Sequence, residues 1–134
     1  MLGAMDADQA IADLTEISPQ VREVVVAPQE GDVLGANVDA TRSEALADGA
    51  RRLLAAADEV RAGHGAGPVA QLEAATTAGS VFVVRDGARI IVATTTPEPT
   101  VGLVFYDLKT CLRSIDEPRQ RRRTRNKESG DAAA

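Results

Sequence analysis

The side chains that could carry out chemistry are few and scattered in this chain of 134 residues. His64 is the only histidine, and it stands between two glycines in a segment expected to be a loop. Zinc sites draw on several His and Cys ligands, and a catalytic triad needs a histidine held between two ordered partners. His64 is therefore expected to be a solvated loop residue. The sequence predicts no catalytic residue, no metal site and no cofactor, and hence a protein that is not an enzyme.

The glycines around His64 have a superficial likeness to a phosphate-binding loop. Gly63, Gly65 and Gly67 are followed directly by Pro68. Phosphate loops work because a strand leads in and a helix N-terminus leads out, which aims backbone N–H groups at the anion. Here a predicted helix precedes the glycines and a predicted strand follows them, which argues against a nucleotide site.

Cys111 is the only cysteine, so no disulfide can form within the chain and a secreted disulfide scaffold is excluded. It stands beside Leu108 and Leu112 in a predicted helix. We expect a small, partly buried packing residue rather than a nucleophile, although Lys109 and Arg113 could lower the thiol pKa if it were exposed.

Carboxylates are spread over all three predicted helices, and a solvated helix surface is the expected role of most of them. They are Asp13 and Glu16 on the first helix, Asp48, Asp58 and Glu59 on the second, and Asp107 on the third. Only the fold decides whether two of them meet as a catalytic pair.

The charge of the chain changes sign near its C-terminus. Residues 1–115 carry nine Lys or Arg and sixteen Asp or Glu, whereas residues 116–134 carry six basic and four acidic groups. The basic groups are Arg119, Arg121, Arg122, Arg123, Arg125 and Lys127. Without an aromatic side chain to stack on bases, specific nucleic-acid binding is not expected. Three interpretations compete: a solvated disordered tail, an electrostatic tether to an acidic protein or anionic membrane, and a nucleic-acid contact.

Hydrophobic periodicity and turn residues predict an α+β fold with the element order αββαβββα. Asp6 and Gln9 form a capping box for a first helix that ends before Pro19, and Thr41 with Glu44 is expected to cap the second. The predicted strands are 21–27, 33–38, 69–76, 80–85 and 89–95, and the later helices are 41–62 and 101–115. An Asp86-Gly87 turn joins the last two strands into a hairpin. The domain is expected over residues 8–115, after a short extension (1–7) and before a disordered basic tail (116–134).

The helix predicted at 41–62 has an apolar surface too wide for one partner. At 100° per residue, two neighbouring stripes cover an arc of roughly 200°, where a surface helix needs only about 100° or somewhat more. One stripe holds Leu46, Gly49, Leu53, Ala56 and Val60, and the other holds Ala47, Ala50, Leu54 and Ala57. We predict that the first stripe lies on the sheet and that the second meets another protein.

Targeting signals are absent from the sequence as given. The first ten residues carry Asp6 and Asp8 but no basic group, which is unlike a signal peptide. No apolar run approaches the ~20 residues of a membrane-spanning helix. A cytoplasmic protein is expected.

Two segments, together with the element order, resemble the roadblock/LC7 family, which includes dynein light chains and bacterial GTPase regulators. The first is IADLTEISPQVREVVVA, followed by a turn into VLGANV, and the second is VGLVFYDL at the start of the last helix. The resemblance covers about residues 8–115. It implies a five-stranded antiparallel sheet with the first and last helices on one face and the second helix on the other.

The resemblance also implies a function by association. Family members form homodimers or heterodimers through the second helix and the third strand, which here would place Ala47, Ala50, Leu54, Ala57 and Leu72 at the interface. Bacterial members bind and regulate Ras-like small GTPases without being enzymes. The expected partners are thus a second copy or a paralogue, and a small GTPase. The alternative is a dimeric scaffold that acts through its basic tail, and a small-molecule sensor is a third possibility that would require an internal pocket.

Overall fold

The computed structural model describes residues 5–63, 65 and 67–115, and confirms the α+β class and the predicted order of elements. His64 and the basic tail lie outside the described residues. The helices are α1 (Ala7–Ile17), α2 (Ala40–Arg61) and α3 (Val101–Ser114). The strands are β1 (Val21–Pro28), β2 (Gly35–Ala36), β3 (Gln71–Thr76), β4 (Gly79–Asp86) and β5 (Arg89–Thr95).

The first two helices begin at acidic caps. The Asp6 side chain accepts a hydrogen bond from the Gln9 backbone N–H at 2.8 Å, which confirms the predicted cap of α1. The predicted cap of α2 is wrong, because Asp39 and not Thr41 accepts the hydrogen bond, from the Arg42 N–H at 2.8 Å. Its carboxylate stands one position before the helix, where a side-chain oxygen can satisfy a free N–H of the first turn.

The five strands form one antiparallel sheet in the order β2-β1-β5-β4-β3. The predicted hairpin between the last two strands is present, but its turn is shifted by one residue: Asp86 pairs with Arg89, so the two loop residues are Gly87, with a positive φ of 65°, and Ala88. The strand predicted at 33–38 shrinks to two residues. Asn37 follows these two residues, and its side chain replaces ladder hydrogen bonds, accepting from the Val24 N–H and donating to the Arg22 carbonyl oxygen, each at 2.8 Å.

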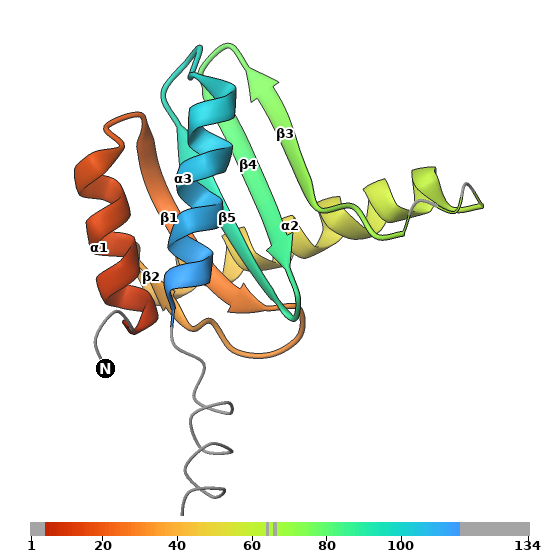
Figure 1. The fold of residues 1–134 in the computed structure, drawn as a ribbon, viewed down its shortest axis with the longest axis horizontal. Coiled ribbons are helices and arrows are strands. Elements are labelled where there is room, and N and C mark those ends of the chain that lie inside the picture. Colours follow the sequence, from red (N-terminus) through yellow and green to blue (C-terminus); the bar gives the residue numbers. More distant parts are fainter. Residues whose placement is uncertain (1–4, 64, 66, 116–134) are drawn as a thin grey trace, which may run out of the picture.

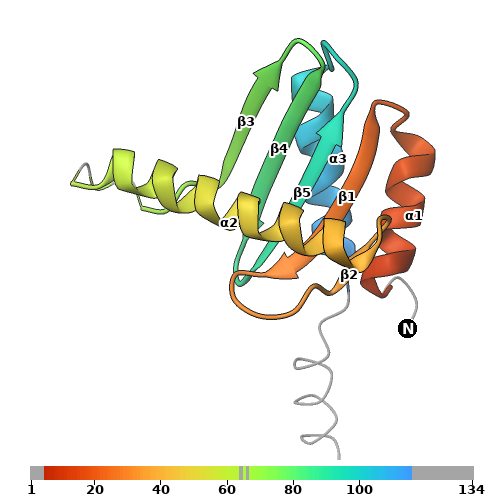
Figure 2. The ribbon, with the colours of Figure 1, turned by 180° about the vertical axis from the view of Figure 1, so that it is seen from behind.

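Two apolar cores lie on opposite faces of the sheet (Figures 1 and 2). Helices α1 and α3 cover one face, where Phe82 and Phe105 meet edge-on with ring centroids 4.9 Å apart. Helix α2 crosses the other face, over Val25, Val83 and Val92. This is the layering that the resemblance implied.

The assignment of the two stripes of α2 is largely reversed in the structure, although Leu46 of the first stripe packs against the core of the sheet as predicted. Ala47, Ala50 and Leu54 are at most 2% exposed and pack into the chain's own core, so they were wrongly predicted to face a partner. Leu53 is 39% and Val60 77% exposed, although both were predicted to lie on the sheet. Both stripes are apolar, and the angle at which α2 meets the sheet selects between them.

Candidate interface on α2 and β3

Helix α2 is longer than the sheet that it crosses. Its 22 residues span about 33 Å, whereas five strands spaced about 4.8 Å apart are about 19 Å wide. Figure 2 shows the C-terminal part of α2 projecting beyond β3. This part of the helix has no sheet of its own chain beneath it.

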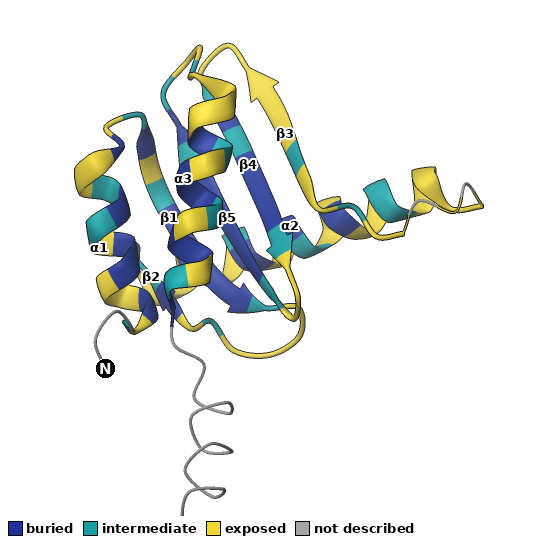
Figure 3. Ribbon diagram, viewed as in Figure 1, coloured by how far each residue is buried: buried dark blue, intermediate teal, exposed yellow. Residues whose placement is uncertain are grey.

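The C-terminal half of α2 carries exposed apolar side chains. Leu53, Ala56 and Val60 are exposed, and the mostly yellow C-terminal half of α2 in Figure 3 shows how little of it is covered. Spacings of three and four residues place them on one side of the helix. We call Leu53, Ala56 and Val60 the outer stripe.

Strand β3 lies at the edge of the sheet and pairs only with β4. Five of its six residues are exposed, and its pairing with β4 shows no register shift. Only Leu72 is half-buried, packed against the core beneath α2. A flat, regular edge strand with free N–H and C=O groups is a template for pairing with another chain.

The opposite edge of the sheet is protected. Strand β2 has only two residues, and α1 lies so close to it that a Cβ added at Gly35 would stand 2.6 Å from the Ala7 Cβ. Short length and coverage by a helix are two ordinary ways to block an edge. The contrast identifies β3 as the edge that is open to a partner.

A cluster of charge-assisted hydrogen bonds ties α2 to β4 and to the segment that leads into β3. The Asp58 Oδ1 atom on α2 accepts from the Val69 N–H and from the Arg85 Nη2, both at 2.7 Å. Arg85 also donates to the Val69 carbonyl oxygen from Nε at 3.0 Å and from Nη2 at 2.7 Å. The hydrogen bond from Arg85, and secondly that from Val69, holds the pKa of the Asp58 carboxyl below its usual range. This cluster was missed, because Asp58 and Arg85 are far apart in the sequence and Asp58 was expected to be a solvated surface residue.

The residues whose types could support chemistry are not brought together in the described part of the chain. Gly63, Gly65 and Gly67 all have positive φ in the segment after α2, and their described neighbourhood offers no helix N-terminus to an anion. Cys111 is 5% exposed, which confirms the packing role. Burial, and secondly the negative charge of Asp13, raise the pKa of its thiol to about 12. Within residues 5–63, 65 and 67–115, no group of three His, Cys, Asp or Glu side chains could hold a metal ion.

Solved structures with the same fold were found by structural comparison. A roadblock/LC7 domain from Streptomyces avermitilis superposes with a TM-score of 0.73 and 19% identity, covering 82% of this chain and 94% of that one. The gliding protein MglB of Thermus thermophilus superposes with a TM-score of 0.71 and 13% identity, covering 86% and 89%. This chain has the roadblock/LC7 fold. A third similar structure, MglB in a tetrameric arrangement, has a TM-score of 0.68 and 14% identity, covering 78% and 81%.

Sequence comparison adds nothing to this structural likeness. No protein-family profile matches the chain, and neither does any curated protein. The two segments that resemble roadblock/LC7 sequences fall on α1–β1–β2 and on α3, which frame the fold rather than its open edge. In the part of the roadblock fold that the structure describes, no helix has the length and hydropathy needed to cross a membrane.

Proposed function

We propose that this chain is a homodimeric, non-enzymatic roadblock-type adaptor that binds and regulates a small Ras-like GTPase. The observation that supports it most is the bare edge of β3 beside the overhanging end of α2. Two copies related by a two-fold axis would pair their β3 edges and lay the outer stripe of each α2 on the other copy. A paralogous roadblock chain with the same edge could take the place of the second copy.

The proposed interface differs from the predicted one in its residues. Ala47, Ala50 and Leu54 are replaced by the outer stripe, Leu53, Ala56 and Val60, because a side chain already buried in its own core has little surface left to offer. Ala57 and Leu72 are half-buried and stay in the proposal, since each keeps part of its surface free for a partner.

Regulation of a GTPase is supported by the fold and by the resemblance of the sequence to bacterial GTPase regulators. A dimer of this kind changes the nucleotide-bound population of a GTPase by binding one state better than the other. No arginine of the chain is assigned a role in hydrolysis.

The interface is tested by Leu53→Glu in the full chain, with the molar mass measured by light scattering during size-exclusion chromatography. Wild type is expected to run as a dimer and Leu53→Glu as a folded monomer, because a charge would be buried without a partner. Tyr106→Glu is the matched control: Tyr106 is 67% exposed on α3, on the other face of the sheet, and should leave the dimer intact. A monomeric wild type, or a dimeric Leu53→Glu, would overturn the interface.

The GTPase is tested by affinity capture with the tagged full chain from lysate supplied with GTPγS or GDP. A Ras-like GTPase captured in one nucleotide state is then purified and its affinity measured in both states. We expect affinities that differ between the states. Equal affinities would remove regulation from the proposal, because a ligand without preference shifts no equilibrium.

The alternative is a dimeric scaffold that presents its basic tails to an acidic protein, a membrane or a nucleic acid. Deletion of residues 118–134 separates the two functions. GTPase binding that survives the deletion supports the adaptor. Loss of all partner binding, with strong dependence on salt in the intact chain, supports the scaffold.

A further inference from the structure

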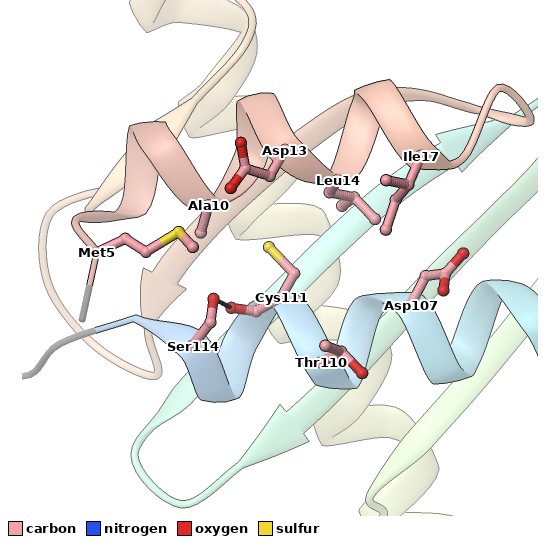
Figure 4. Close-up of a pocket in the computed structure, with 9 residues that line it drawn as sticks. All are labelled: Met5, Ala10, Asp13, Leu14, Ile17, Asp107, Thr110, Cys111 and Ser114. Carbon is pink, nitrogen blue, oxygen red and sulfur yellow. Dashed lines mark hydrogen bonds between the residues drawn. The ribbon is translucent and has the colours of Figure 1, made fainter. Parts of the chain in front are cut away.

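A groove runs between α1 and α3, on the face of the sheet opposite α2 (Figure 4). Its volume is about 200 Å³. The floor is apolar, made by Ala10, Leu14 and Cys111, all at most 5% exposed. Ile17, 68% exposed, forms part of the rim. The groove plays no part in the proposed dimer.

Two carboxylates stand on opposite walls of this groove. Asp107 projects from α3 towards α1, and Asp13 belongs to the α1 wall (Figure 4). Asp107 is only 9% exposed, yet it forms no ion pair and accepts no side-chain hydrogen bond from the described residues. Asp13 accepts one, from the Gln9 Nε2 at 3.1 Å. A carboxylate that lines a groove without a donor from its own chain can accept charge-assisted hydrogen bonds from a cationic ligand.

The shape and charge of the groove define what fits it. An apolar floor between two carboxylates suits a side chain with an aliphatic stem and a cationic head. Arginine has both, since its methylene groups can cover apolar surface while the guanidinium donates to carboxylates. Lysine fits less well, because its ammonium group lacks the paired donors of arginine.

The chain carries such side chains directly beyond the groove. Ser114 lines one end of it, and the next residue, Ile115, is held there by a bridge to Met5. Six of the nine residues 119–127 are Arg or Lys. Asp107 lies seven residues before Ser114, about 10.5 Å along the helix. Arg121 lies six residues beyond Ile115, a reach of up to about 20 Å when extended. The basic segment can therefore reach both carboxylates.

We propose that the α1–α3 groove is a docking site for the C-terminal segment 116–134 of the same chain, with arginine side chains on its floor and their guanidinium groups paired with Asp107 and Asp13. Attachment to the same chain gives the segment an effective concentration of order mM, so weak pairing is enough to populate the docked form. An acidic partner that recruits the segment must then compete with the groove.

The test uses methyl NMR of the full chain, with Leu14 and Ile17 as groove reporters and Leu53 as a distant one. Replacing Arg121, Arg122 and Arg123 by Gln should shift the Leu14 and Ile17 methyl signals and leave Leu53 unchanged. High salt should produce the same shifts in wild type. In an Asp107→Asn background the same tail replacement should add little, because the two changes remove one interaction. Equal shifts in wild type and Asp107→Asn, or none in wild type, would overturn the proposal.

A second measurement uses a synthetic peptide of residues 116–134, added to the full chain whose three arginines are replaced. We expect binding that weakens about fivefold or more with Asp107→Asn, a change equivalent to losing one charge-assisted contact. Glu30→Gln, an exposed acid on the β1–β2 loop, is the matched control and should leave the affinity unchanged. Equal losses in both variants would show attraction to net charge only, and would overturn the site. Dilution of the wild-type chain provides a last check. If its Leu14 and Ile17 methyl signals then move to the positions of the three-arginine variant, the groove is occupied by the segment of a second copy, which would overturn the proposal.

Discussion

Arg85 on β4 and Asp58 on α2 are joined through a single nitrogen, the Arg85 Nη2, which lies 2.7 and 3.0 Å from the two carboxylate oxygens. The Arg85 side chain is 12% exposed and that of Asp58 34%. Both also bind the backbone of Val69, where the chain returns from α2 towards β3. The pair therefore sets how the open strand edge lies against the helix beside it.

Arg85→Met should reduce the free energy of unfolding by about 2 kcal/mol, because hydrogen bonds from a charged group to Asp58 and to the Val69 carbonyl are lost. Hydrogen exchange at Val69 and Ala70 should rise, and urea unfolding at fixed protein concentration gives the stability. Arg113→Met is the matched control. It breaks the exposed pair with Asp86, whose side chains are 68% and 43% exposed, and should change stability by no more than about 0.5 kcal/mol. Similar losses in the two variants would contradict the special role of Arg85.

Leu54→Ala should destabilise the fold by about 2–5 kcal/mol, because the truncation leaves a cavity between α2 and the chain's own sheet. Leu53→Ala, one residue away, should have a much smaller effect when both are compared in a chain held monomeric by Val60→Glu. Chemical unfolding measures both. If Leu53→Ala were the more damaging change in the monomer, the reversed assignment of the stripes would be wrong.

Gly79→Ala should destabilise the β3–β4 turn strongly. A Cβ at Gly79 would stand 2.2 Å from the Thr95 carbonyl oxygen, and its φ of 151° lies where side chains are rarely found. Gly87→Ala provides the comparison, since its φ is 65° but nothing lies within 4 Å of the added Cβ. It should cost only about 1–2 kcal/mol. Thermal unfolding should show a clearly larger fall in melting temperature for Gly79→Ala than for Gly87→Ala. Equal falls would mean that the backbone conformation, and not the contact with Thr95, determines the effect of the added Cβ.

Acid should weaken the link between β1 and α2. The hydrogen bond from Arg42, with a smaller one from Thr94, holds the pKa of Glu23 below its ordinary value of 4.5. A carboxyl with a lowered pKa in the folded state adds stability above the unfolded value, and this is lost as the pH falls through the folded value. Stability should therefore fall less steeply below pH 4.5 in Glu23→Gln than in wild type, as measured by urea unfolding at a series of pH values. Glu30→Gln, exposed and outside the ion pairs of the described residues, should retain the wild-type slope.

Local patterns predicted the elements well, whereas contacts between distant residues decided what was missed. Periodicity placed all three helices and the order of five strands, because amphipathic spacing and turn residues act over a few positions. The choice between the Leu53 and Leu54 stripes was wrong, since both satisfy the same spacing. The Asp58–Arg85 pair joins residues 27 positions apart, and the buried position of Asp107 depends on how α1 lies against α3. None of these relationships has a local signal in the sequence.

Cys111 should be unreactive in the folded chain and should make stability depend on pH in alkali. Burial first, and the charge of Asp13 second, raise its thiol pKa from 9.0 to about 12. Only the thiolate attacks a disulfide reagent, so Ellman's reagent at about pH 8 should label the native chain very slowly and the urea-unfolded chain at once. The folded state holds the thiol proton more tightly than the unfolded state does. The contribution of the Cys111 thiol to folding stability is therefore complete below about pH 9 and is lost as the pH rises towards 12. Cys111→Ala should flatten the decline of stability in alkali, although it leaves a small cavity. Asp13→Asn should retain most of that decline, since burial is the larger cause of the raised pKa. Rapid labelling of the native chain would place the thiol at the surface and contradict the apolar floor of the groove.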